Sequence, residues 1–152
     1  MDEIINLGVK VVEIKLKRLH KDAKIPTYGT EDSACVDLYA IEDYTFHPGG
    51  LKRIHSGWSC EIPKGYYVEV YNRSGMASKK QLVIVSSRVI DADYRGEIFT
   101  PIKNIGDTVQ IINKGDRFAQ MLLKKRIYMV FEEVAELTPT NRGSGGFGST
   151  GK

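Results

Sequence analysis

The stretch Val12-Glu13-Ile14-Lys15-Leu16-Lys17 alternates aliphatic and charged residues without a break. Because successive side chains of a strand point to opposite faces, this alternation predicts a half-buried β-strand. Further short runs are rich in β-branched and aromatic residues and are bounded by Gly, Pro, Asn or Asp. These runs are 67–71, 82–85, 98–102, 108–112, 118–123 and 127–131. The sequence therefore predicts an all-β protein.

Turn signals separate these runs, for example Pro48-Gly49-Gly50 and Asn113-Lys114-Gly115-Asp116. Only residues 74–81 read as a short helix, with Ser74 at its start. Pro101 cannot donate a ladder hydrogen bond, so we expect its strand to lie at a sheet edge or to carry a bulge. The expected fold is a distorted jelly-roll barrel or sandwich with one short helix.

Composition narrows the class of protein. The 152 residues fit a single domain, and the net charge of +3, from 22 Lys and Arg against 19 Asp and Glu, argues against binding of duplex DNA. Cys35 and Cys60 lack CxxC spacing, which favours reduced thiols inside a cell. We expect no signal or transit peptide and no membrane span, hence a soluble intracellular protein. The expected compartment is the cytoplasm or the nucleus, and the expected source is a cell or a virus.

The last residues, 138–152, differ sharply from the rest of the chain. They hold five glycines together with Ser and Thr. Arg142 is their one charged residue before the terminal Lys152, and Phe147 is their one aromatic residue. Composition alone favours a flexible tail after a domain of residues 1–137. The alternative is functional, because glycines let backbone N–H groups approach an anion and Phe147 can stack on a base.

Motifs of well-known enzyme classes are absent from the sequence. It has no GxxxxGK[ST] loop, no GxSxG, no HExxH and no Cys/His cluster at metal-ligand spacing. The three histidines are scattered, and we expect them to be structural or surface residues. What remains is a set of polar motifs at turns, where a β scaffold presents functional groups.

Three of these turns are candidate sites. Asn72-Arg73-Ser74-Gly75 can form a phosphate cradle at a helix start, or merely a capped turn. In Ile90-Asp91-Ala92-Asp93-Tyr94-Arg95-Gly96, Asp91 can orient and deprotonate a water and Tyr94 can face a sugar, or both acids can be turn formers. In Gly115-Asp116-Arg117-Phe118-Ala119-Gln120, the Arg and Gln can face a ligand or pair within the turn.

In order and spacing these motifs resemble those of the homotrimeric dUTPase family, from about residue 25 to the end. The five segments are Ala34-Cys35-Val36-Asp37-Leu38, Arg73-Ser74-Gly75, Val89 through Gly96, Gly115 through Gln120, and Arg142 through Gly151. The resemblance implies a jelly-roll subunit of a trimer with shared active sites. It also implies hydrolysis of dUTP to dUMP and pyrophosphate, which limits uracil in DNA and supplies dUMP for thymidylate synthesis.

The resemblance also implies roles for individual residues. Asp91 would hold the water that attacks the α-phosphorus, and Asp37 would contact waters on a Mg²⁺ ion held by the phosphates. The 138–152 arm would close over the site of another subunit. Substrate binding would fall to Arg73, Ser74, Gly75, Val89, Ile90, Tyr94, Gln120, Arg142, Phe147, Gly148, Ser149 and Thr150.

Four positions depart from the family pattern. Cys35 stands where Gly is common, Val36 where an aromatic is frequent, and Arg88 where small residues are typical. Asn72 replaces a common Pro, which we expect to loosen the turn before Arg73. Three rival interpretations are a dCTP deaminase, a non-catalytic nucleotide sensor or single-strand binder, and a structural trimer with inactive sites. Dependence of binding on the triphosphate and Mg²⁺, or on oligonucleotide length, separates an enzyme from a strand binder.

Overall fold

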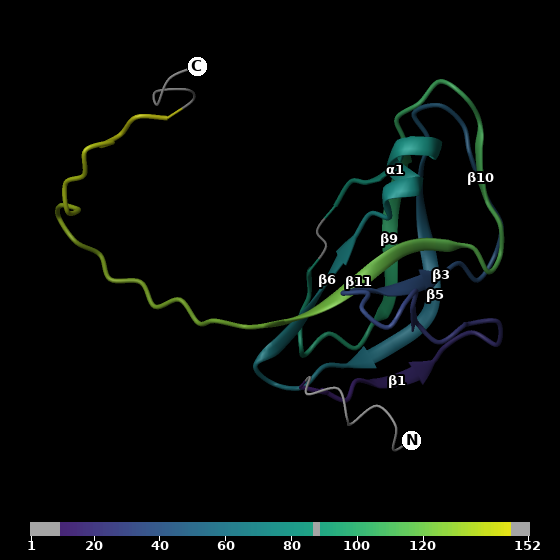
Figure 1. The fold of residues 1–152 in the computed structure, drawn as a ribbon, viewed down its shortest axis with the longest axis horizontal. Helices are drawn as coiled ribbons and strands as arrows, with labels where there is room; N and C mark the ends of the chain where they lie inside the picture. The colour runs from purple at the N-terminus through teal and green to yellow at the C-terminus, as the bar shows by residue number, and fades with distance from the viewer. Residues whose placement is uncertain (1–9, 87–88, 147–152) are drawn as a thin grey trace.

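A computed structural model describes residues 10–86 and 89–146 (Figure 1). Its strands form two main sheets, and one short helix lies between the sixth and seventh strands of the chain. One sheet has the order β1-β5-β9-β7 and the other β2-β3-β11-β6-β8, while β4 and β10 pair separately. The strands are β1 (Lys15–Arg18), β2 (Thr27–Tyr28), β3 (Val36–Tyr39), β4 (Tyr44–Phe46), β5 (Leu51–Glu61), β6 (Tyr66–Tyr71), β7 (Leu82–Ile84), β8 (Val89–Ile90), β9 (Glu97–Asn104), β10 (Gln110–Ile112) and β11 (Arg117–Lys125); the helix is α1 (Ser74–Lys80). The predicted all-β class, with one short helix, is confirmed.

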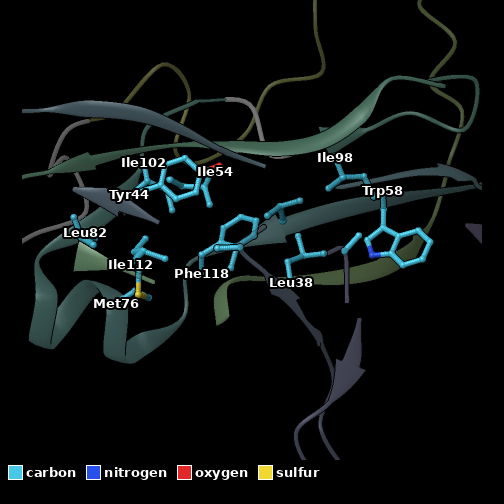
Figure 2. Close-up of a cluster of buried hydrophobic side chains, with 14 of the residues drawn as sticks. Leu38, Tyr44, Ile54, Trp58, Met76, Leu82, Ile98, Ile102, Ile112 and Phe118 are labelled. Atoms are coloured by element: carbon cyan, nitrogen blue, oxygen red, sulfur yellow. The ribbon is translucent and has the colours of Figure 1, made fainter. Parts of the chain in front are cut away.

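The core lies between the sheets. Figure 2 shows Phe118 of β11 among side chains from both layers, and Phe118, Leu38 and Ile54 are each at most 1% exposed. Strand β9 alternates buried and accessible residues along its length, which places Ile98 and Ile102 in the core. In β9, the period-2 pattern of the sequence thus identifies the face that points into the core, because the opposite face is accessible to solvent.

The longest strand, β5, is not marked by such a pattern. Its burial runs continuously from Ser56 to Cys60, so its sequence does not alternate. The register with β9 shifts between His55 and Ser59, where Gly57 has a φ of +75°. An irregularity of this kind breaks the period-2 side-chain pattern on which the sequence prediction relies.

Pro101 lies in an interior strand, so the edge expectation is wrong. β9 is hydrogen-bonded to β5 on one side and to β7 on the other. Strand β7 ends at Ile84, and one further bond runs from the Val85 N–H to the Pro101 carbonyl at 3.2 Å. The missing N–H of Pro101 therefore falls at the end of this ladder, where its loss interrupts no continuing pairing.

Residues 126–146 leave the body of the protein as an extended arm (Figure 1). The strand predicted over 127–131 does not form, because no strand of the same chain lies beside it among the described residues. Its apolar side chains are open to solvent, with Ile127, Val130 and Phe131 each at least 85% exposed. The boundary at residue 137 stays a prediction.

Candidate active site

Three segments that are far apart in the sequence meet around Asp37. Strand β3 carries Asp37 opposite Gln120 of β11, and Arg73 follows the neighbouring strand β6. Arg73 Nε lies 2.8 Å from Asp37 Oδ1, and Arg117 Nη1 donates to Oδ2 at 3.1 Å. The Asp37 side chain is only 10% exposed. The first, second and fourth motifs of the sequence therefore form one cluster within a single chain.

The cluster opens onto a cleft of about 280 Å³ that carries an excess of positive charge. Arg73, Lys80 and Arg117 line it, against the single carboxylate of Asp116. Asp116 Oδ2 is engaged by the Asn113 N–H at 2.9 Å. Guanidinium and ammonium groups at the rim of a cleft favour a phosphate-bearing ligand.

Asn72 ties the turn before Arg73 in place, so the expected loosening is wrong. Its Nδ2 donates to the Leu82 carbonyl at 2.9 Å, and its Oδ1 accepts from the Ile84 N–H at 2.7 Å. Its own carbonyl accepts from Gln120 Nε2 at 3.2 Å. Because β6 and β7 belong to different sheets, this one amide connects both sheets next to the cluster.

Ser74 and Gly75 open helix α1 beside the same cleft. Ser74 is exposed, and its carbonyl accepts from Ser78 Oγ at 2.7 Å. A Cβ placed on Gly75 would meet no atom within 4 Å. Nothing described in this chain therefore requires glycine at position 75, which leaves room for a ligand or a neighbouring chain to approach the backbone there.

A second cavity, of about 300 Å³, lies under the hairpin that follows β8. Val89, Ile90, Asp91 and Tyr94 line it. The hairpin turns tightly, with the Tyr94 N–H donating to the Asp91 carbonyl at 3.1 Å, and the Asp91 side chain is exposed. Strand β8 is the last strand of its sheet, so one of its edges presents backbone groups that the described residues do not pair.

The two sites lie at opposite ends of β6. Ile90 pairs with Val68 near the start of that strand, whereas Arg73 follows its end. The five residue steps from Val68 to Arg73 span about 16 Å of extended chain, and Asp91 continues away from Arg73. One chain therefore does not bring Asp91 to its own cluster around Asp37.

The predicted residues of the arm are only partly described. Arg142 Nε donates to the Gly145 carbonyl at 2.9 Å within a local turn of the exposed arm. Phe147, Gly148, Ser149 and Thr150 lie outside the described residues. Arg142 lines neither cavity in the single chain.

The described residues contain no group of three or more His, Cys, Asp and Glu arranged to hold a metal ion. His55 has a structural contact, with Nδ1 lying 2.9 Å from Glu97 Oε2. Cys35 and Cys60 are free thiols, and burial raises the pKa of both. In the part of the chain that is described, no helix is long and apolar enough to cross a membrane.

The sequence marks Arg117 as a residue that can face a ligand, but it predicts neither the contact of Arg117 with Asp37 nor the place of Lys80 at the cleft. Arg117 and Asp37 are 80 positions apart, and the pairing of β3 with β11 alone brings them together. Lys80 reaches the cleft from the last turn of α1, with its Nζ donating to the Ile111 carbonyl at 2.6 Å. No local sequence pattern signals these charge partners, because the burial of Asp37 that calls for them follows only from the fold.

Comparisons with known proteins identify the family to which the chain belongs. The protein-family model described as dUTPase matches residues 21–151. The deoxyuridine 5'-triphosphate nucleotidohydrolase of Nautilia profundicola is 41% identical over 142 residues, covering 93% of this chain and 100% of the relative. The chain is therefore a member of the dUTPase family.

Solved structures agree with the fold. A mutant dUTPase of Staphylococcus bacteriophage 80alpha with dUpNHpp superposes with a TM-score of 0.85 at 26% identity, covering 93% of this chain and 100% of that chain. A mutant dUTPase from phage phi11 of S. aureus, described with a structural Mg(II) ion, has a TM-score of 0.77 at 23% identity, covering 84% and 100%. The two packed sheets are thus the jelly-roll-like fold of dUTPases.

Proposed function

We propose that this chain is a dUTP diphosphatase, which hydrolyses dUTP to dUMP and pyrophosphate. Its dUTPase family membership over residues 21–151 carries this conclusion. The geometry supports it, because the matched motifs form a cationic cluster at one end of β6 and a nucleoside-sized cavity at the other. The activity limits dUTP as a source of uracil in DNA and yields dUMP.

The phosphate chain is held at the cationic cluster. Arg73 presents a guanidinium whose orientation is fixed by Asp37 on one side and by the Arg117 carbonyl on the other, at 2.8 and 3.3 Å. Gln120 is placed by its bond to the Asn72 carbonyl. Ser74 adds a hydroxyl, and the open space at Gly75 lets a phosphate oxygen approach the backbone. Preorganised donors of this kind stabilise charge that develops on the phosphates.

Asp37 fits an outer-sphere contact to Mg²⁺. A carboxylate has about four lone-pair sites, and the two arginines occupy one on each oxygen of Asp37. Mg²⁺ keeps several waters and commonly binds through substrate phosphates with one or two carboxylates. When bound, the ion supplies neutralisation of the phosphate charge. Asp37 would accept hydrogen bonds from the waters on the ion while it holds the guanidiniums of Arg73 and Arg117.

Asp91 serves as the group that orients the attacking water. Its carboxylate is exposed at the mouth of the hairpin cavity and has no hydrogen-bond or ion-pair partner among the described residues. A carboxylate without a structural partner can accept a proton from a water that it positions against the α-phosphorus. Asp91 is therefore the catalytic residue of the proposed mechanism.

The base is read by the open edge of β8. The main-chain groups of Val89 and Ile90 would pair with the carbonyl at position 4 and the N3 hydrogen of uracil. Cytosine reverses this donor and acceptor pattern, leaving buried groups unpaired at about 1–3 kcal/mol each. Tyr94 packs on the deoxyribose and leaves no room for a 2′-hydroxyl.

The complete site is assembled from different chains of a homotrimer. The separation of about 16 Å along β6 prevents one chain from supplying both Asp91 and the cluster around Arg73. The exposed apolar residues of 127–131 give the arm a surface with which to pack on a second copy. Arg142, Phe147, Gly148, Ser149 and Thr150 would then close over a neighbour's site and exclude water.

A parallel product assay tests this function. Purified protein with Mg²⁺ is given dUTP, dCTP, dTTP and UTP separately, and nucleotides and pyrophosphate are quantified. The proposal requires conversion of dUTP alone to dUMP with equimolar pyrophosphate. Consumption of dCTP would favour a deaminase, and binding of dUTP without turnover would favour a sensor; either result would reject it.

A further inference from the structure

Gly96 lies directly beneath the ring of Tyr94 at the exit of the hairpin. A Cβ placed on Gly96 would be 2.9 Å from Tyr94 Cε2, 2.5 Å from Cζ and closer still to the hydroxyl oxygen. Real Cβ atoms essentially never approach other heavy atoms below 3.0 Å. The observed position of the Tyr94 ring is therefore compatible with glycine alone at position 96.

Two hydrogen bonds hold the ring and the backbone in this arrangement. Tyr94 Oη donates to the Glu97 carbonyl at 3.1 Å, so the ring spans residue 96. Ser59 Oγ donates to the Arg95 carbonyl at 2.7 Å, which fixes the backbone just before Gly96 to strand β5. The Tyr94 ring therefore lies across a backbone segment that is held in place by its hydrogen bond to β5.

We propose that Gly96 is the positioning residue that sets the sugar selectivity of the nucleoside cavity, by letting the Tyr94 side chain lie close against the backbone of residue 96. This inference rests on the proposed function, in which Tyr94 faces the deoxyribose. Tyr94 lines the cavity and is 40% exposed, so its ring forms an outer wall whose place decides how much space the sugar has. A side chain at position 96 displaces that wall.

The cost of a side chain at position 96 falls on Tyr94 and not on the fold. Gly96 is not among the glycines with positive φ, so its backbone conformation suits an alanine. The three nearest contacts of the added Cβ are with the end of the Tyr94 side chain. Because that side chain is partly exposed, it can swing away while the hairpin keeps its backbone bonds.

A double-mutant cycle tests the proposal. The wild type, Gly96→Ala, Tyr94→Ala and the double variant are compared by the ratio of kcat/KM for dUTP to that for UTP, with thermal unfolding as a check on folding. We expect Gly96→Ala to lower this ratio at least about tenfold, and to change it less than about twofold in the Tyr94→Ala background, where no ring remains to be displaced. Tyr94→Phe, which loses the bond to the Glu97 carbonyl, should lower the ratio by a smaller factor.

Three results would overturn the proposal. An unchanged dUTP to UTP ratio in Gly96→Ala would show that the ring is not displaced or does not matter. An equal effect of Gly96→Ala in both backgrounds would show that the residue acts through the backbone. No effect of Tyr94→Ala on the ratio would remove the role of the ring itself. The proposed function fails separately, if the wild type turns over no dUTP.

Discussion

Replacing Asn72 by alanine should destabilise the protein at the point where its two sheets are joined. The change removes the bonds to the Leu82 carbonyl and from the Ile84 N–H, at 2.9 and 2.7 Å. Each bond contributes about 0.5–1.5 kcal/mol net, so the expected loss is about 1–3 kcal/mol. For a chain of this length, that corresponds to a fall in Tm of about 2–12 °C.

The same change should weaken substrate binding. Asn72 precedes Arg73, and its carbonyl holds Gln120, so movement of the turn displaces two side chains that we propose bind the phosphates. We expect KM for dUTP to rise while the Asp91 end of the site, which β8 positions, is unaffected. Denaturant titration measures the free energy of unfolding, and steady-state kinetics separates KM from kcat.

Asn113→Ala is the matched control for this prediction. Asn113 is exposed, and its side-chain contact to Asp116 Oδ2 is long, at 3.4 Å. Its replacement should cost less than about 0.5 kcal/mol. If Asn72→Ala shifts the free energy of unfolding by no more than Asn113→Ala does, the reasoning that Asn72 ties the sheets together is refuted.

Three further predictions concern other parts of the molecule. Asp91→Asn should abolish turnover while calorimetry still detects binding of a non-hydrolysable dUTP analogue; parallel loss of binding would contradict its catalytic role. Gly75→Ala should not lower Tm, because the new methyl meets no described atom and alanine suits a helix better than glycine, but it should raise KM by crowding the phosphates; an unchanged KM would remove Gly75 from the site. Hydrogen bonding from Tyr71 and the contact with Lys124 lower the pKa of Glu69 to about 2, so its stabilisation is complete above its ordinary pKa of 4.5 and is lost as the pH falls toward 2. The difference in Tm between wild type and Glu69→Gln should therefore shrink as the pH falls from 4.5 toward 2. A constant difference would count against a stabilising role of the ionised Glu69 carboxylate.

The sequence predicts the fold class because most strands have one wet face. Val68 and Val70 alternate with Tyr67, Glu69 and Tyr71 in β6, and the structure buries the two valines. Strand β5 escapes this logic, since it is buried on both faces and irregular near Gly57. Local pattern cannot reveal either condition.

The candidate site was predictable as a set of residues but not as an arrangement. Turn motifs mark Arg73 and Gln120, whereas the ion pairs of Asp37 with Arg73 and Arg117 depend on strand pairing across the sheet. The sequence does not predict the hydrogen bonds of Asn72 to β7, because an asparagine in place of a common proline indicates a loss of rigidity. An asparagine amide can replace that rigidity with two hydrogen bonds to a neighbouring strand.

In the proposed trimer, Asp91 of one chain serves the cluster around Arg73 of another. Subunit complementation tests it directly: inactive Asp91→Asn and Arg73→Ala proteins are co-assembled at equal amounts and assayed with dUTP. In a cyclic trimer every mixed assembly contains one intact site, so random mixing should restore about a quarter of the wild-type activity. If assemblies shown to contain both variants have no activity above that of either variant alone, the shared site is contradicted.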